Sequence, residues 1–302
     1  MYHSLTSGKI HKKRGIDEYR VIAVDNAPPL PHTVAMKKTN AWGNKPKLGQ
    51  HFLADRSICA RIVEAAEIHS GDHVVEIGPG MGALTGLLAS ATPRLTLVEP
   101  DRELAFQMML HHGGATILKE KAEDVDFSAL DGPITVVSNL PYYASVFIFK
   151  HLIAHKRNIT RMVLMFQKEV ARRIASGPGH RSYGSLSVLS AYHWAIEELM
   201  IVKPGSFNPP PKVDSAVLRF TPLAVPPVAV DEAVLFAVVK AAFAQKRRTL
   251  RNNLKGIYTA ASMEEAMAAA KLGPNARAEE TPLAAFALLA EHLKKPDRAS
   301  EE

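Results

Sequence analysis

The segment from Asn139 to Tyr142 carries the residue types best suited to chemistry on an aromatic amine. It reads Asn139-Leu140-Pro141-Tyr142 and follows the apolar run 134–137, so we expect it at the carboxyl end of a buried strand. The Asn139 side-chain oxygen and the Pro141 backbone carbonyl can accept both hydrogens of an exocyclic amine. Tyr142 can stack on the ring that bears this amine. At the end of a strand beside a ligand site, the segment therefore favours methyl transfer to the N6 amine of an extruded adenine, and a Pro-Tyr turn that only closes the strand is the alternative.

A glycine-rich loop precedes this segment and predicts the methyl donor. The loop reads Glu76-Ile77-Gly78-Pro79-Gly80-Met81-Gly82, between an apolar run at 73–77 and a helical pattern at 83–90. Glu99 ends the next apolar run, 17 residues after Gly82, where a carboxylate can accept hydrogen bonds from ribose hydroxyls. Dinucleotide sites use Gly-x-Gly-x-x-Gly, which remains the alternative. This Gly-x-Gly-x-Gly spacing after a glutamate is typical of sites for S-adenosylmethionine.

The composition excludes several other classes of protein. The single cysteine, Cys59, excludes an internal disulfide and a Cys-rich zinc site, and it fits a reducing, cytoplasmic setting. The 13 histidines are scattered without ligand spacing, so we expect no metal. No run of about 18 apolar residues is present, so we expect no membrane span. Lys+Arg 37 against Asp+Glu 30 gives a net charge of +7, which favours a polyanionic partner.

The pattern of elements predicts an α/β fold that would position these residues. Short apolar runs at 73–77, 94–98, 115–118, 134–137 and 162–166 predict strands. Helical patterns separate them, including one over 56–68 that opens with Asp55 as its N-cap. Alternating strands and helices predict a mostly parallel sheet covered on both faces. Ligands of such sheets bind at the carboxyl ends of the strands, where both motifs fall.

The chain changes character outside the predicted catalytic domain, 48–221. Residues 222–230 form a Pro-rich linker, and helical patterns at 231–244, 247–256, 263–271 and 283–294 predict a small all-helical domain over 231–295. Residues 1–47 predict a disordered basic tail in which Met36 is an alternative start, and a basic arm that contacts RNA is the other interpretation. Residues 296–302 predict a second disordered tail.

These motifs, taken in order, resemble the ribosomal RNA adenine N6,N6-dimethyltransferase family over residues 47–293. Within it, the chain is most similar to the bacterial small-subunit enzymes, which modify two adjacent adenosines near the 3′ end of 16S rRNA. The segments that carry the resemblance are Gly49–Leu53, Val75–Gly80, Asn139–Tyr142, Gln167–Val170, Phe207–Ser215 and Ala242–Leu254.

The resemblance implies a Rossmann-like class I S-adenosylmethionine-dependent methyltransferase sheet followed by a helical rRNA-binding domain. It implies a cytoplasmic monomer that acts on 16S rRNA in the small subunit or its precursor, with a role in subunit biogenesis. Phe207 would pack against the second face of the target base, with core packing as the alternative role. Catalytic roles fall to Asn139, Pro141, Tyr142 and Phe207. The implied cofactor residues are His51, Leu53, Gly78, Gly80, Glu99, Lys121, Ala122 and Asn139.

Two positions depart from the family pattern. Where the family usually has an acidic residue before a small one, this chain has Lys121-Ala122. Lysine only donates hydrogen bonds, so it cannot accept from the cofactor adenine, and we expect cofactor affinity to be lower by about 1 kcal/mol. Glu120, Glu123 or Asp124 could take over this contact, or cofactor binding could rely instead on the Ala122 backbone amide. The second departure is Tyr143, which we expect to narrow the target pocket.

A basic run predicts the RNA contact. Between Lys240 and Lys255 there are six basic residues and no acidic one. Lys246, Arg247, Arg248 and Arg251 fall within about one and a half turns of the helix predicted over 247–256. A solvated charged face is the alternative. Phosphate contacts here would position the rRNA, whereas shape and a single-stranded loop would give specificity.

Two other functions remain open at this stage. One is a 23S rRNA adenine N6-methyltransferase of the resistance type, which the run 242–254 and the segment 207–215 disfavour. The other is a ribosome-assembly factor that acts mainly by binding, which Lys121 favours and the intact segment 139–142 opposes.

Overall fold

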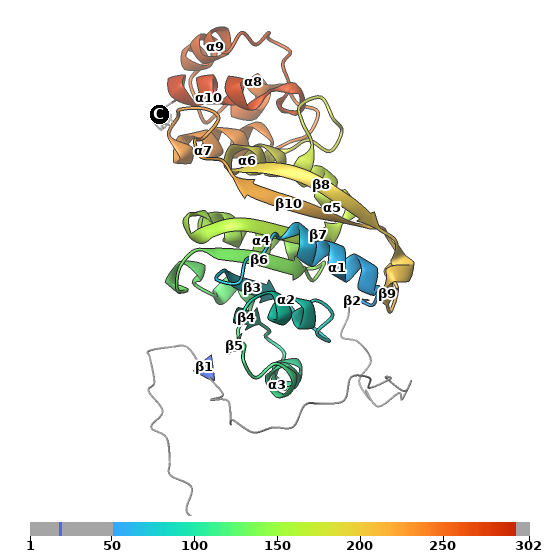
Figure 1. The fold of residues 1–302 in the computed structure, drawn as a ribbon. Helices are drawn as coiled ribbons and strands as arrows, with labels where there is room; N and C mark the ends of the chain where they lie inside the picture. The colour runs from blue at the N-terminus through green and yellow to red at the C-terminus, as the bar shows by residue number, and fades with distance from the viewer. Residues whose placement is uncertain (1–17, 20–50, 294–302) are drawn as a thin grey trace, which may run out of the picture.

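The computed structural model describes residues 18–19 and 51–293 of the chain (Figure 1). Predictions for the remainder of the tail 1–47, including Met36 and the basic arm, lie outside these residues, as do those for 296–302. No helix in the described ranges is long and apolar enough to cross a membrane.

An eight-stranded sheet forms the centre of the molecule, in the order β1-β5-β4-β3-β6-β7-β10-β8. The five strands from β5 to β7 are mutually parallel, and β10 is antiparallel to both of its neighbours. The predicted strands at 73–77 and 94–98 are confirmed to the residue. The strands are β1 (Glu18–Tyr19), β3 (His73–Ile77), β4 (Arg94–Val98), β5 (Thr116–Leu118), β6 (Ile134–Asn139), β7 (Ile159–Gln167), β8 (Trp194–Val202) and β10 (Ser215–Pro222).

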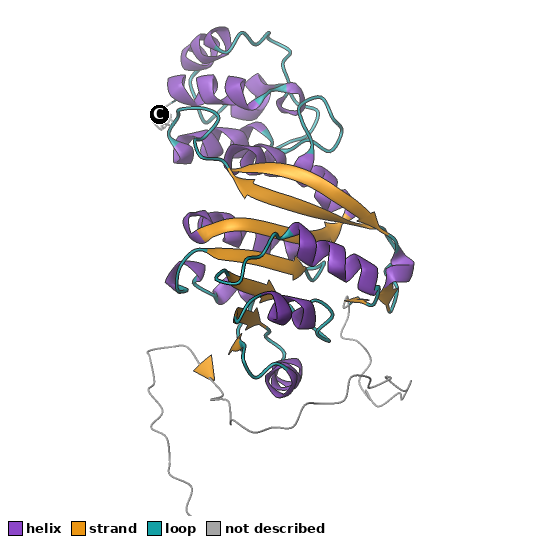
Figure 2. Cartoon of the chain, viewed as in Figure 1, coloured by secondary structure: helices purple, strands orange, loops and turns teal. Residues whose placement is uncertain are grey.

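Alternate residues of the central strands face two separate apolar cores, because side chains of a strand alternate between faces. Val74 packs with α1, α2 and α3 on one face, whereas Val75 packs with α4, α5 and α6 on the other. Helices therefore cover both faces, as predicted (Figure 2). These helices are α1 (Arg56–Ala65), α2 (Thr85–Ala91), α3 (Arg102–His111), α4 (Ser145–Ala154), α5 (Lys168–Ala175) and α6 (Ser185–His193).

A helical region follows the sheet, beyond β8 and β10 (Figure 1). Its core includes Leu235 and Phe286, and Tyr183 and the α6 residues Val188 and Tyr192 join the same core. The helices are α7 (Glu232–Ala242), α8 (Leu250–Leu254), α9 (Ala260–Ala269) and α10 (Leu283–His292). Single-turn 3₁₀ helices occupy Ala122–Asp124, Phe127–Ala129, Lys156–Asn158, Pro204–Ser206 and Ala278–Glu280.

Helix α8 is shorter than the helix predicted over 247–256. Thr249 is its N-cap, with the hydroxyl accepting from the Asn252 amide, and Arg247 has a φ of 68°. Positive φ is incompatible with a right-handed helix. Lys246, Arg247 and Arg248 therefore lie in the turn before α8 rather than on it.

A second, two-stranded sheet joins distant parts of the chain. It pairs β2 (Phe52–Leu53) with β9 (Phe207–Asn208) in antiparallel register. The Ala54 amide adds a 2.8 Å hydrogen bond to the Ser206 carbonyl. This pairing fixes the segment before α1 beside the segment that leads into β10.

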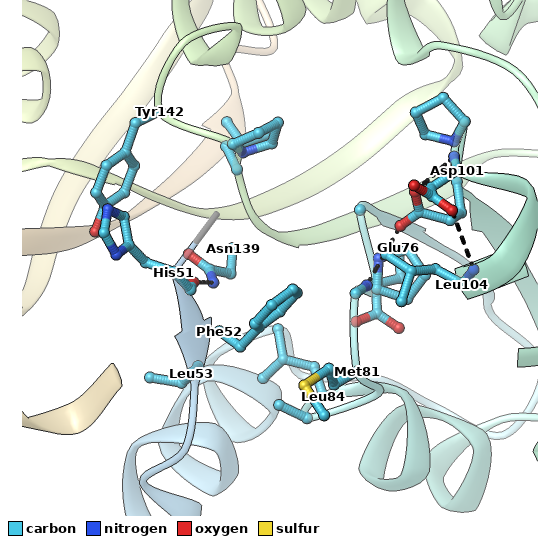
Figure 3. A pocket seen from close by; sticks show the side chains of 18 of the residues that line it. His51, Phe52, Leu53, Glu76, Met81, Leu84, Asp101, Leu104, Asn139 and Tyr142 are labelled. Carbon is cyan, nitrogen blue, oxygen red and sulfur yellow. Dashed lines mark hydrogen bonds between the residues drawn. The ribbon is translucent and has the colours of Figure 1, made fainter. Parts of the chain in front are cut away.

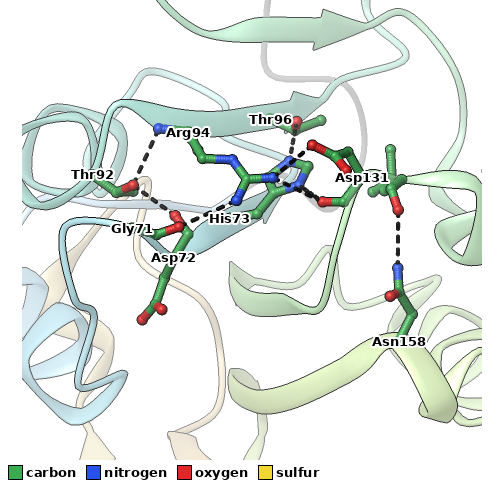
Figure 4. Close-up of polar contacts among 9 residues, drawn as sticks. Gly71, Asp72, His73, Thr92, Arg94, Thr96, Asp131 and Asn158 are labelled. Carbon is green, nitrogen blue, oxygen red and sulfur yellow. Dashed lines mark hydrogen bonds and ion pairs between the residues drawn. The ribbon is translucent and has the colours of Figure 1, made fainter.

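Polar contacts fasten the amino ends of the strands, at the end opposite to the carboxyl ends (Figure 4). His73 is buried, and its Nδ1 donates to the Asp131 carbonyl at 2.8 Å. Its Nε2 accepts from the Thr96 hydroxyl, also at 2.8 Å. Arg94 adds an ion pair with Asp131 at 2.9 Å. One imidazole thus connects β3, β4 and the turn before β6.

We expect His73→Ala to lower the free energy of unfolding by about 2 kcal/mol, because it leaves the buried Thr96 hydroxyl without its imidazole partner and removes one of the two hydrogen bonds to the Asp131 carbonyl. Urea denaturation measures the change. His69→Ala is the matched control, since the His69 side chain is 84% exposed. A loss at position 73 no larger than the loss at position 69 would contradict the structural role of the imidazole.

Candidate active site

A cavity of about 330 Å³ opens at the carboxyl ends of the parallel strands (Figure 3). It is lined from the segment 51–53, the glycine loop, the end of β4 and the segment after β6. Most of the predicted cofactor and catalytic residues meet in this cavity: His51, Leu53, Gly78, Gly80, Glu99, Lys121, Asn139, Pro141 and Tyr142.

The glycine loop takes a conformation that favours glycine. Gly78, Gly80 and Gly82 have φ values of 65°, 57° and 80°, in the left-handed region that side chains disfavour. At Gly80 a Cβ would also lie 2.8 Å from Cε1 of Phe52. The Phe52 ring therefore lies close against the loop, and a side chain at residue 80 would strain the backbone and displace this ring.

Glu99 is held in place by the backbone of the loop and of the next helix. Its side chain accepts from the Asp101 amide at 2.9 Å and from the Gly80 amide at 3.4 Å. A carboxylate has about four acceptor positions, so it can accept further hydrogen bonds from ribose hydroxyls. This geometry suits the predicted contact with the ribose of the cofactor.

Glu76 is a buried carboxyl group on the wall of the same cavity. It is 2% exposed, and its Oε2 accepts from the Thr85 hydroxyl at 2.7 Å. Burial raises its pKa to about 8, and the nearby Glu99 charge adds to the rise. A cation bound beside Glu76 would favour the ionised form. The cavity, lined by Glu76, Glu99 and Asp101, thus fits the positively charged sulfonium and ammonium groups of S-adenosylmethionine.

Asn139 lines the cavity beside the segment 51–53. Its Nδ2 donates to the His51 carbonyl at 3.1 Å, which turns Oδ1 toward other donors. His51 in turn donates from Nδ1 to the Pro209 carbonyl at 2.9 Å. The segment 51–53, just before α1, therefore orients the side-chain amide of Asn139.

Tyr142 is held at both its hydroxyl and its ring. The hydroxyl lies 2.5 Å from the Ser215 hydroxyl, and burial raises the pKa of the phenol. The ring centroid is 5.4 Å from that of His51, with the planes tilted by 35°. These contacts fix the orientation of an aromatic surface that lines the cavity.

Ala122 and Phe207 do not line the main cavity, and the carbonyl of a third predicted residue, Pro141, already has a hydrogen-bond partner. Ala122 lies in a recess that adjoins the cavity. Phe207 is 4% exposed, packs in the apolar core with Leu53 and is not among the residues that line the cavity. Its contact with the target base stays a prediction. The Pro141 carbonyl already accepts from the Ala144 amide at 3.0 Å, which leaves its second lone pair.

The basic residues of the helical region are exposed or partly exposed, and acidic partners from distant positions join two of them. The Arg247 amide donates to Glu279 at 3.3 Å, and the Arg251 guanidinium forms an ion pair with Glu264. The sequence between 240 and 255 contains no acidic residue, so these partners could not be seen along the chain.

Several residues of the site were missed as site residues in the sequence. Phe52 lies between the predicted residues His51 and Leu53, and Glu76 opens the glycine-loop motif. These two motifs were the signal in the sequence that could have identified them. Ser215 ends the segment 207–215, but nothing local connects its hydroxyl to Tyr142, 73 residues earlier. Met81, Leu84 and Leu104 also line the cavity (Figure 3).

Comparison with known proteins adds an independent finding. Residues 42–295 match the family model described as ribosomal RNA adenine dimethylase. The chain is 44% identical over 254 residues to ribosomal RNA small subunit methyltransferase A of Acidobacterium capsulatum, covering 82% of this chain and 90% of that protein. It is 41% identical over 269 residues to the protein of the same name from Pseudomonas putida, covering 84% and 97%.

Solved structures share the fold. A dimethyladenosine transferase from Plasmodium falciparum superposes with a TM-score of 0.67 at 24% identity, covering 81% of this chain and 98% of that one. The 23S rRNA methyltransferase ErmE superposes with a TM-score of 0.63 at 26% identity, covering 81% and 100%.

The buried Glu76 predicts a specific dependence of stability on pH. Its pKa rises from 4.5 to about 8 on folding, so its favourable contribution is complete below about pH 4.5 and is lost as the pH rises through 8. Glu76→Gln cannot ionise, so we expect the variant to gain stability relative to the wild type between pH 5 and pH 9. Denaturant unfolding across this range measures the difference. Glu103→Gln, at an exposed glutamate, is the control, and a difference that does not vary with pH would contradict the assignment.

Proposed function

The chain belongs to the ribosomal RNA adenine dimethylase family, and on this premise we propose that its target is a pair of adjacent adenosines near the 3′ end of 16S rRNA. It is an S-adenosylmethionine-dependent rRNA adenine dimethyltransferase. The observation that carries the proposal is the common cavity, into which Asn139–Tyr142, the glycine loop and Glu99 all open. When bound, the cofactor supplies a methyl group on a positively charged sulfur.

Asn139 orients the target amine in this proposal. Its Nδ2 is committed to the His51 carbonyl, so its Oδ1 accepts one N6 hydrogen of the adenine. The second hydrogen goes to a backbone carbonyl of the same turn, the predicted one being that of Pro141. Two acceptors fix the nitrogen so that its lone pair faces the methyl group. The product gives up its extra proton readily to water, so no strong general base is required.

Tyr142 holds the base. Its hydroxyl is bonded to Ser215 and its ring lies beside His51, so the stacking surface keeps one orientation. Stacking contributes about 1–3 kcal/mol per base, which offsets much of the cost of extruding the adenosine from its stack. Phe207 is proposed to cover the second face of the base.

The RNA is proposed to cross from this site to the helical region. Lys168, Arg172 and Arg181 line a groove that also includes Asp214, the neighbour of Ser215. The loop that carries Arg181 is attached to the helical region by hydrogen bonds from the Gly179 amide to the Glu279 carbonyl and from the Tyr183 hydroxyl to the Thr281 carbonyl. Basic side chains thus extend from the target site toward the exposed residues Lys246 and Arg248.

The relatives favour the small subunit over the large one. Proteins named for the small subunit are 41–44% identical to this chain, whereas the 23S rRNA enzyme ErmE is 26% identical. We also propose that the enzyme is cytoplasmic and has a role in small-subunit biogenesis, since its substrate is rRNA in that subunit or its precursor. We propose that it acts as a monomer.

We expect the double variant Asn139→Ala, Tyr142→Ala to lose methyl transfer by at least about 100-fold, because both the amine acceptor and the stacking surface are removed. Transfer of labelled methyl groups to under-methylated small subunits measures the loss, and mass mapping of 16S rRNA locates the methyl groups. Tyr142→Phe keeps the ring and should retain most activity. Asn275→Ala, at an exposed asparagine, is the control. Full activity in the double variant would overturn the mechanism, and methylation of isolated large subunits alone would move the target to 23S rRNA.

We expect Lys246→Ala with Arg248→Ala to flatten the salt dependence of rRNA binding. The slope of log affinity against log salt should fall by about 0.7–0.9 for each lost phosphate contact. Filter binding between 50 mM and 200 mM salt measures the slope. Lys150→Ala with Arg157→Ala removes an equal charge from exposed positions on α4 and just before β7 and serves as the control. An unchanged slope in the double variant would remove the two residues from the interface.

A further inference from the structure

The hydroxyl groups of Tyr142 and Ser215 are hydrogen-bonded to each other, with their oxygens 2.5 Å apart. Ser215 is fully buried, whereas Tyr142 is partly buried on the wall of the cavity. Among the residues that the structure describes, neither hydroxyl has a second hydrogen-bond partner. The direction in which the Tyr142 ring points therefore depends on where Ser215 lies.

Ser215 is the first residue of β10, and the strands on both sides fix its position. It pairs with Gln167 at the end of β7 and with Val202 at the end of β8. Both neighbouring strands run antiparallel to β10, so Ser215 lies where they end. The serine is thus at the same edge of the sheet as Asn139, which ends β6 beside β7.

Asp214, directly before Ser215, connects the two residues that follow these strand ends. Its Oδ2 accepts from the Lys203 Nζ at 2.9 Å and from the Lys168 Nζ at 3.1 Å. Its carbonyl accepts from the Lys168 amide at 2.9 Å. The hydrogen bonds from Lys203 and Lys168 lower the pKa of Asp214, so its carboxylate stays charged. One carboxylate therefore ties three chain segments together, one residue beyond the pairs that Ser215 makes.

We propose that Asp214 and Ser215 are positioning residues for the target base, because together they set the orientation of the Tyr142 ring. This inference rests on the proposed function, in which that ring stacks on the adenine. Asp214 fixes the start of β10 against its two neighbours, and the Ser215 hydroxyl fixes the hydroxyl end of the ring. A ring held in this way presents the N6 amine to Asn139 in one pose, as methyl transfer requires.

The pairing of two hydroxyls makes the inference separable from a role in folding alone. Removal of the serine hydroxyl leaves the Tyr142 hydroxyl without a partner, which costs more than removal of both hydroxyls. We expect the ring to turn until its hydroxyl meets water or another partner. Tyr142→Phe takes away the reason to turn, so it should suppress the defect of Ser215→Ala.

Methylation kinetics on under-methylated small subunits test the link between Ser215 and Tyr142. We expect Ser215→Ala to lower kcat about tenfold, within the roughly 100-fold that a misplacement of about 1 Å can cause. Its KM should stay within about twofold, because phosphate contacts supply most of the affinity for RNA. The double variant Ser215→Ala, Tyr142→Phe should recover the kcat of Tyr142→Phe alone. Ser190→Ala is the matched control, since Ser190 is also fully buried but donates to the Leu186 carbonyl of its own helix.

Asp214→Ala separates positioning from charge. Loss of an acidic group from the groove of Lys168 and Arg172 should strengthen phosphate binding and lower KM. Because Asp214 also positions Ser215, kcat should fall as well, by about threefold to tenfold. Glu169→Ala is the matched control and should lower KM alone. Glu169 lines the same groove, and no hydrogen bond or ion pair joins it to Asp214 in the part of the chain that the structure describes.

Three outcomes would overturn the proposal. The first is a Ser215→Ala variant with the kcat of the wild type. The second is a kcat defect that stays the same when Tyr142→Phe is added, since the serine would then serve only the fold. The third is an Asp214→Ala variant that lowers KM alone, as Glu169→Ala does. An error in the proposed rRNA target is distinguishable, because the wild type would then methylate large subunits, and the same variants would be compared on that substrate.

Discussion

Parallel pairing of β3 with β4 and β6 is the constraint on which the site depends. Ile77 pairs with Val98, and Glu76 pairs with Val137, so the three strands end at nearly the same level. The glycine loop, Glu99 and Asn139 follow or end these strands and therefore share one edge of the sheet. A slip of one residue in either pairing would turn the side chains to the opposite face. The catalytic geometry is thus a consequence of strand register, which two apolar cores specify from both faces.

The segment 51–55 completes the site from outside the sheet. It pairs with residues near 207, more than 150 positions later, and it positions both the Asn139 amide and the loop. Phe52 lies against Gly80, and the His51 imidazole bonds the Pro209 carbonyl. A short two-stranded sheet would be unstable alone. Here α1, capped by Asp55, and the core around Leu53 hold it in place.

Charge is divided between two surfaces with different ligands. The chain carries a net charge of +7, yet three carboxyl groups, those of Glu76, Glu99 and Asp101, line the cavity against one lysine, Lys121. A cationic cofactor suits the cavity, whereas phosphates are proposed to bind the exposed basic turn before α8 and the groove of Lys168, Arg172 and Arg181, which also contains Glu169 and Asp214. Glu76 can be buried because its raised pKa keeps the carboxyl group mainly protonated and neutral. A cation bound beside it would favour the ionised carboxylate.

The sequence by itself determined the elements with strong local signals. Strands 73–77 and 94–98 were predicted to the residue because short, mainly apolar runs are followed by Gly78 in one case and by Glu99-Pro100 in the other. The glycine loop and Asn139–Tyr142 were found by residue type and spacing. Strands β8 and β10 were not predicted, since Glu197 and Glu198 interrupt the apolar pattern of β8 at the sheet edge. Only the tertiary structure decided that Phe207 is buried, that Glu264 and Glu279 contact the basic run, and that Lys121, Glu123 and Tyr143 share a recess. The physical reason is that strand propensity and turn chemistry act between neighbours in the chain, whereas burial and charge pairing are set by residues that only folding brings together.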